Sequence, residues 1–160
     1  MTRWIFVVLL AATAGCGYSS HFELPDNIQR VAVPIFENKT LYRDLEYDLT
    51  AAVKQEIQAR SKLEVTEVEG ADAVLSGVII DYSVYAIRTD QDSQTTEYAV
   101  VLTFDAKLEE QEGGKILFAT KGRRITSTYV VARGEDETTA RRVAFARMAR
   151  QLVALALESW

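Results

Sequence analysis

The sequence contains a single cysteine and a single histidine, and both scarcities exclude chemistry. A lone cysteine, Cys16, cannot form an internal disulfide. Because His21 is the only histidine, the chain cannot supply the several cysteine and histidine ligands of a zinc site. His21 also lies five residues after Cys16, at a place where it can hardly be organised into a catalytic pair. Neither a catalytic triad nor a zinc site is therefore expected.

The sequence also lacks a glycine-rich phosphate loop between a strand and a helix. Acidic residues are plentiful, but Glu109, Glu110 and Glu112 flank a turn, where a solvated cluster is favoured over paired catalytic carboxylates. No nucleophile is organised with a base. We therefore predict that the protein is not an enzyme and that it needs no metal or cofactor.

A long hydrophobic run is missing as well, because the apolar stretch from Trp4 to Ala14 is about half of the roughly 20 residues that a spanning helix needs. Arg3 precedes it and small residues end it, as in a signal peptide. Thr13-Ala14-Gly15-Cys16 resembles the bacterial lipobox, although Thr13 stands where that motif usually has leucine. A plain secretory signal with a buried thiol is the alternative. We predict a lipoprotein signal peptide over residues 1–15 and lipid attachment at Cys16.

Lipidation would tether the chain to a membrane without spanning it. One acyl chain anchors a protein only marginally, whereas each buried methylene adds about 0.8 kcal/mol, so two or three chains hold it durably. Gly17 follows the cysteine, whereas aspartate at that position would resemble the inner-membrane retention signal of enteric bacteria. Because this aspartate is absent, we expect the protein at the periplasmic face of the outer membrane.

The rest of the chain has the size of one domain, which we place over residues 28–160. Residues 16–27 form a short lipidated tether that ends in a turn at Pro25-Asp26-Asn27. Loss of Arg3 with the signal peptide takes the net charge from −5 to −6. This acidic balance disfavours a nucleic-acid partner, and any anionic ligand has to be met by a local basic cluster.

Apolar spacing predicts an α+β fold. We expect a two-layer sandwich of a mixed, mostly antiparallel sheet, in the order β-α-β-β-β-β-α, with two helices on one face. The first strand, helix and second strand form a right-handed βαβ unit. The expected strands are Ile28–Ile35, Leu63–Val68, Ala73–Arg88, Glu97–Glu110 and Lys115–Val131, and the expected helices are 37–62 and Glu135–Trp160.

Several side chains are assigned within these elements. Gly122 predicts a bulge or bend, residues 89–96 predict a hairpin loop, and Asp136 is the expected N-cap of the last helix. The apolar stripe of the first helix is Leu41, Leu45, Leu49, Val53 and Ile57, and the core-facing residues of the last are Val143, Met148, Leu152 and Leu155.

The strand Ala73–Arg88 carries apolar residues on both faces. A strand of this kind is buried on both faces. Two explanations remain open: another part of the same chain covers the second face, or a partner protein does.

Basic residues stand out in this acidic chain at Arg88, Lys121, Arg123 and Arg124. Guanidinium groups are well shaped for bidentate phosphate contacts, so these residues could bind phosphates. The alternative is a solvated strand edge that charge protects from pairing.

The assembly of motifs resembles the LptE-like family of lipopolysaccharide-assembly lipoproteins of Gram-negative bacteria. The resemblance rests on Cys16-Gly17-Tyr18, VAVPIFENKT (31–40), ADAVLSGVI (71–79) and QTTEYAV (94–100), whose order and spacing cover nearly the whole chain. It implies a small α/β domain that plugs and stabilises the LptD-like β-barrel of the outer membrane and binds lipopolysaccharide. By position, it implies lipopolysaccharide contacts for Arg88 and Lys121, with Arg123 or Arg124 as alternatives to Lys121.

The motif V-A-V-P-x-F-E-N-K-T before a helix also resembles LpoB-like periplasmic activators of peptidoglycan synthases. A regulator of that kind has to reach through the cell wall, which calls for a long flexible linker. Only about ten residues separate Cys16 from the first expected strand. The plug is therefore preferred and the regulator is the alternative.

Overall fold

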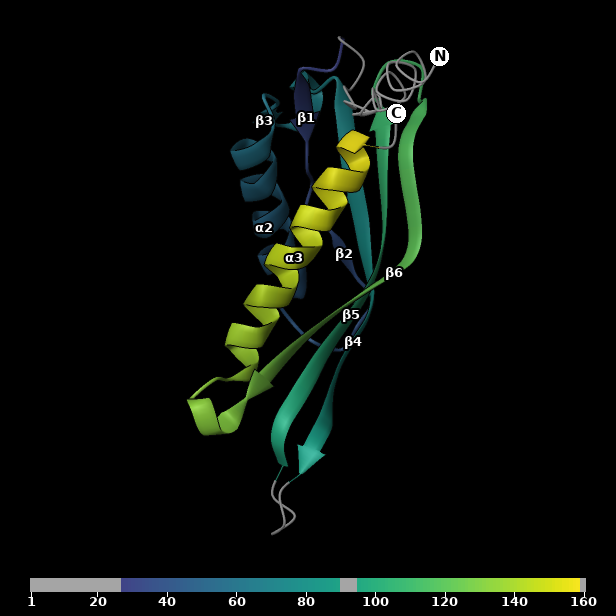
Figure 1. Cartoon of the computed structure of the whole chain (residues 1–160). Coiled ribbons are helices and arrows are strands. Elements are labelled where there is room, and N and C mark those ends of the chain that lie inside the picture. Colours follow the sequence, from purple (N-terminus) through teal and green to yellow (C-terminus); the bar gives the residue numbers. More distant parts are fainter. Residues whose placement is uncertain (1–26, 90–94, 159–160) are drawn as a thin grey trace, which may run out of the picture.

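The structure is a computed structural model that describes residues 27–89 and 95–158. The predicted signal peptide, Cys16 and all of the tether except Asn27 lie outside these residues, as does most of the predicted hairpin loop. Figure 1 shows one mixed sheet with two helices packed on one of its faces. The predicted two-layer α+β fold is therefore confirmed.

The first third of the domain is a βαβ unit. Strand β1 (Arg30–Ala32) leads to helix α2 (Leu45–Arg60), which returns the chain to strand β3 (Glu64–Thr66). β1 and β3 pair in parallel, as a crossover of this kind requires. Val68, predicted in the strand, instead begins a short 3-10 turn, η2 (Val68–Gly70).

The segment between β1 and α2 differs from the prediction. The chain leaves the sheet after Ala32 and forms a second short strand, β2 (Glu37–Asn38), which pairs in parallel with the middle of strand β4 (Ala73–Thr89). The helix therefore begins at Leu45, and Leu41, predicted in its apolar stripe, is fully exposed. The other four predicted stripe residues are buried: Leu45, Leu49, Val53 and Ile57.

Hydrogen bonds explain why the helix starts late. The side-chain oxygen of Asn38 accepts bonds from the backbone N–H and the hydroxyl of Thr40, at 3.0 and 2.8 Å. The backbone N–H of Lys39 donates to the carbonyl of Ile79 on β4 at 2.9 Å. Asparagine favours such local turns over helix, so the ENKT sequence ends a strand before the helix can begin.

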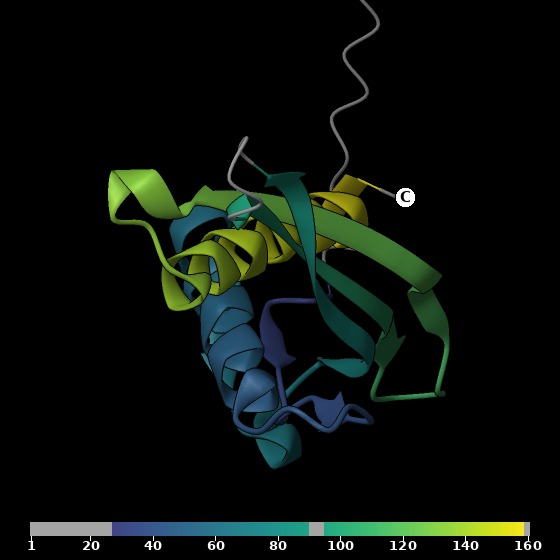
Figure 2. The ribbon, with the colours of Figure 1, turned by 90° about the horizontal axis from the view of Figure 1, so that it is seen from below.

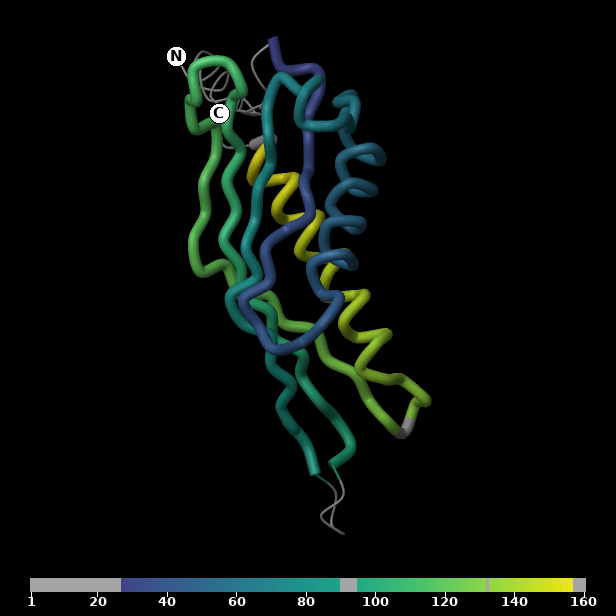
Figure 3. Tube along the Cα trace, turned by 180° about the vertical axis from the view of Figure 1, so that it is seen from behind, coloured from purple at the N-terminus to yellow at the C-terminus, as the bar shows by residue number. Residues whose placement is uncertain are grey.

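Three long antiparallel strands make up the rest of the sheet. They are β4, β5 (Thr95–Glu110) and β6 (Ile116–Val130), and the strand order is β3-β1-β4-β5-β6. The β4–β5 hairpin extends beyond the helices at the end of the molecule opposite to β1 and β3 (Figures 1 and 3). Seen from that end, the sheet is strongly twisted and curves around α3 (Figure 2).

Strands β4 and β6 each carry a bulge at nearly the same level of the sheet. Ile80 is an extra residue in β4, and residues 121 and 122 both lie opposite Asp105 of β5. Gly122 has a φ of 59° and donates its N–H to the Asp105 carboxylate at 2.7 Å. The predicted bulge at Gly122 is confirmed, because glycine adopts this left-handed conformation at little cost.

Helix α3 (Glu137–Glu158) follows β6 after a 3-10 turn, η3 (Val131–Arg133). The predicted N-cap is confirmed, since the Asp136 carboxylate accepts the backbone N–H of Thr139 at 2.7 Å. Val143, predicted in the core, is 39% exposed. Met148 and Leu152 are buried as predicted, and Leu155 packs partly buried against the core. The buried stripe also includes Ala140, Ala144, Phe145, Ala149, Val153 and Ala156.

Candidate functional site

Arg88 lies near the end of β4, in the part of the hairpin that projects from the body. Its side chain is 75% exposed and its Nε lies 3.7 Å from Glu97 Oε2 on β5. A shallow hollow at this end of the sheet is lined by Arg88, Glu97, Arg133 and Glu135, together with Thr96, Thr128 and Val130. Two guanidinium groups from distant parts of the sequence thus reach one surface hollow.

Arg133 was not predicted as a site residue. Strand register brings it there, because Glu97 is opposite both Arg88 on β4 and Val130 on β6, and η3 follows Val130 directly. Gly134 then takes a left-handed conformation, and the Glu135 carboxylate accepts the backbone N–H of Val130 at 2.7 Å. This closed turn holds Arg133 beside the end of the sheet.

Lys121, Arg123 and Arg124 occupy a different place, around the Gly122 bulge. Arg124 is opposite Thr103 of β5, whereas Arg88 is opposite Glu97, six residues along the same strand. At about 3.4 Å per residue, this separates the two groups by about 20 Å along the sheet. The structure therefore brings Arg88 together with Arg133 and not with the three cations of β6.

The bulge also divides those three cations between the faces of the sheet. Arg123 pairs with Phe104, a core-facing residue, and Arg124 pairs with Thr103, which faces the opposite side. All three side chains are exposed. Lipopolysaccharide binding by Lys121, Arg123 and Arg124 stays a prediction.

The helix-free face of β4 carries apolar side chains that the described residues leave open. Ile80, Tyr85 and Ile87 are 41%, 44% and 51% exposed. Both helices pack on the opposite face, so neither covers these groups (Figure 1). Large apolar side chains gathered on one surface are typical of interfaces.

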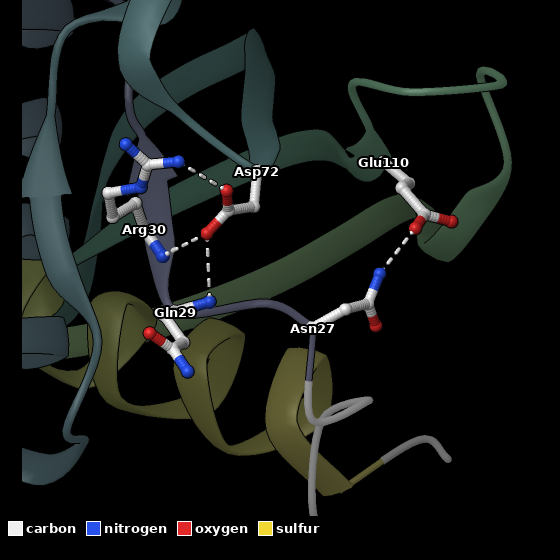
Figure 4. Close-up of polar contacts among 5 residues, drawn as sticks. All are labelled: Asn27, Gln29, Arg30, Asp72 and Glu110. Atoms are coloured by element: carbon white, nitrogen blue, oxygen red, sulfur yellow. Dashed lines mark hydrogen bonds and ion pairs between the residues drawn. The ribbon is translucent and has the colours of Figure 1, made fainter.

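A polar cluster at the other end of the molecule holds the place where the chain enters the domain (Figure 4). The Asp72 carboxylate, at the start of β4, accepts the backbone N–H groups of Gln29 and Arg30 at 3.0 and 2.8 Å and the Arg30 guanidinium at 2.8 Å. The Arg30 guanidinium and these N–H groups lower the pKa of Asp72 to about 2. Asn27 donates to Glu110 on β5 at 2.7 Å. The cluster fixes the end of the tether to two strands.

Over residues 27–89 and 95–158, no group of three or more histidine, cysteine, aspartate or glutamate side chains is placed to hold a metal ion. Neither helix of the described chain has the length and apolar character for crossing a membrane.

The comparison with protein families decides the assignment. Residues 28–155 match LptE, the lipopolysaccharide-assembly family. The chain belongs to this family. No curated protein matches it.

Solved structures share the fold of this LptE-family chain at low sequence identity. A hypothetical protein from Chlamydia trachomatis is 9% identical with a TM-score of 0.56, and covers 79% of this chain and 94% of its own. A minor lipoprotein from Acinetobacter baumannii is 15% identical with a TM-score of 0.53, covering 82% and 94%. Uncharacterized lipoprotein B from Nitrosomonas europaea is 16% identical with a TM-score of 0.50, covering 83% and 86%. These likenesses concern the fold alone.

The motifs that first resembled LptE proteins have structural roles in this chain. In VAVPIFENKT, Phe36 enters the core and Asn38 forms the turn before α2; in ADAVLSGVI, Asp72 binds β1. In QTTEYAV, Tyr98 stacks on Tyr129 of β6 with ring centroids 5.1 Å apart. These three motifs therefore help to specify the fold of this LptE-family chain.

Proposed function

We propose that this LptE-family chain is a lipoprotein of the outer membrane, anchored through an acylated Cys16, that plugs an LptD-like β-barrel and binds lipopolysaccharide during assembly. The observation that carries the proposal is the family match over residues 28–155, which spans the whole folded domain. The protein acts by binding, with no covalent step.

The shape of the molecule supports the role of a plug. The sheet is long, its hairpin projects beyond the helices, and apolar side chains on its helix-free face stay open to a partner (Figures 1 and 3). A barrel wall around the domain would cover them and remove the apolar surface from water.

Arg88 and Arg133 are the groups that we assign to lipopolysaccharide. Guanidinium forks bind phosphate in a bidentate manner, and lipid A and the core carry phosphates. Glu97 and Glu135 line the same hollow, so the charges of its two arginines and two glutamates balance. Glu97 pairs with Arg88 in the free protein. A phosphate would compete with Glu97 for Arg88.

Charge reversal at these arginines tests the assignment. We expect Arg88→Glu and Arg133→Glu each to weaken lipopolysaccharide binding by the purified domain about tenfold or more, since a repulsion replaces a charge-assisted contact. The measurement is a direct titration with lipopolysaccharide, alongside thermal unfolding of each variant.

Arg124→Glu is the matched control, because it reverses one exposed arginine about 20 Å away. Unchanged binding by Arg88→Glu and Arg133→Glu would reject the hollow as the site. Loss in Arg124→Glu alone would move the site to the Gly122 bulge.

A further inference from the structure

The outer surface of α3 is strongly basic in an otherwise acidic chain. Residues 138–157 include four arginines and no acidic residue. Two of the arginines bond to α2: Arg141 Nη2 lies 3.3 Å from Asp48 Oδ2, and Arg150 Nε lies 3.8 Å from Glu56 Oε1. The other two, Arg142 and Arg147, are exposed, and neither forms an ion pair with any residue that the structure describes.

A groove between α2 and α3 lies beside these charges. Small and apolar side chains form part of its lining, and Arg141 and Arg142 stand on the α3 side. The apolar members are Ala51, Ala52, Phe145 and Ala146. Val143, 39% exposed, continues the apolar surface along α3 between Arg142 and Arg147. The groove therefore combines an apolar lining with the Arg141–Asp48 pair and with Arg142, which forms no ion pair with a described residue. Arg147 lies outside the groove, on the exposed outer side of α3.

We propose that the exposed surface of α3, from Arg142 at this groove to Arg147 on the outer side of the helix, binds an acidic polypeptide segment of the barrel partner. The identity of the partner rests on the proposed function above. Charge complementarity carries the inference, since arginine beside apolar surface is enriched in protein interfaces and bonds carboxylates through two parallel N–H groups.

A membrane surface fits the same arginines less well. A helix that lies on lipid needs large apolar side chains on the side that enters the bilayer. Phe145, Met148, Leu152 and Val153 of α3 are buried in the core. Among the α3 residues whose side chains the structure describes, the exposed apolar ones are Val143 and Ala146. The acidic balance of the chain would also oppose an extended plane of anionic headgroups.

The test is co-purification of the full chain with the barrel from detergent-extracted membranes, with the barrel identified and quantified by mass spectrometry. We expect the double variant Arg142→Glu/Arg147→Glu to recover at least about tenfold less barrel than the wild type, because like charges meet across the interface. Its lipopolysaccharide binding, titrated on the purified domain, should stay within about twofold of the wild type.

Arg43→Glu/Lys62→Glu is the control, since it makes the same change in net charge at exposed positions flanking α2. Arg142→Gln/Arg147→Gln removes the charge without reversing it and should give a smaller loss of barrel. Equal barrel recovery by wild type and double variant would overturn the inference alone. If the double variant lost lipopolysaccharide binding but retained the barrel, the inference would also be overturned, and Arg142 and Arg147 would belong to a phosphate site. Absence of the barrel from the wild-type sample would overturn the proposed function as well.

Discussion

Phe36 and Gly77 meet in a contact that joins two of the family motifs. The Phe36 ring is buried against β4, and a Cβ added at Gly77 would lie 2.7 Å from two of its ring carbons. The Phe36 N–H also donates to the Thr50 hydroxyl on α2 at 3.0 Å. Strand, crossover and helix are thus fixed around one aromatic ring, and glycine is the residue that leaves room for it.

Gly77→Ala should therefore lower the free energy of unfolding by about 1–3 kcal/mol, because a buried ring has no free space into which it can move. Urea unfolding followed by circular dichroism measures the change. Gly70→Ala is the control: its added Cβ would lie at an ordinary 3.5 Å from the nearest atom, so little change is expected there. Equal stability of Gly77→Ala and the wild type would contradict the close contact.

At the scale of elements, β1 depends on a single carboxylate at the start of β4. β1 contains only three residues, and its pairing with β4 covers two positions. Asp72, whose side chain is 22% exposed, accepts three hydrogen bonds from Gln29 and Arg30, one of which is its ion pair with the Arg30 guanidinium (Figure 4). These bonds hold the strand through which the tether joins the domain.

The Asp72 contribution should depend on pH in a defined direction. Its folded-state pKa of about 2 lies below the ordinary value of 3.8, so the ionised form stabilises the fold at neutral pH. That contribution is lost as the pH falls from about 4 to about 2. Asp72→Asn should cost about 1–2 kcal/mol at pH 7 and almost nothing at pH 2. Urea unfolding of both proteins across this range measures the difference, and a pH-independent gap would contradict the assignment.

The sequence predicted the long elements better than the short ones. Alternation over sixteen residues identifies β5, and a good N-cap locates the start of α3, because such signals depend only on nearby residues. The start of α2 was wrong because the four-residue apolar spacing extends back to Leu41, whereas β2 pairs with a strand about forty residues later. Long-range pairing of this kind leaves no local pattern.

The same limit applied to the candidate site. Arg88 could be found as a lone cation at a strand end, but Arg133 joins it only through the register of β4, β5 and β6. The register of Arg88 depends on the extra residues Ile80 and Ile87 in β4, each of which shifts the pairing with β5 by one residue. The short connection between β6 and α3 indicates that Arg133 lies near the end of β6. The sequence does not indicate which residue of β4 lies at the same end of the sheet.

For the whole molecule, the motif shared with LpoB-like regulators carries less functional weight than its sequence suggests. Phe36 and Asn38 of VAVPIFENKT build the crossover, so any protein with this fold can use them. The choice between plug and regulator depends instead on the family match over residues 28–155 and on the surfaces that we assign to partners. These surfaces are the hollow with Arg88 and Arg133, the open sheet face and the α3 arginines.

The account is tested most directly by the stoichiometry of the wild-type complex. The full chain with Cys16 intact is extracted in detergent, purified, and quantified by mass spectrometry together with its acylated N-terminus and every co-purifying outer-membrane protein. We predict a diacylated or triacylated Cys16 and one large LptD-like barrel in near-equal amount. Recovery of a peptidoglycan synthase without any barrel would contradict the account and favour the regulator.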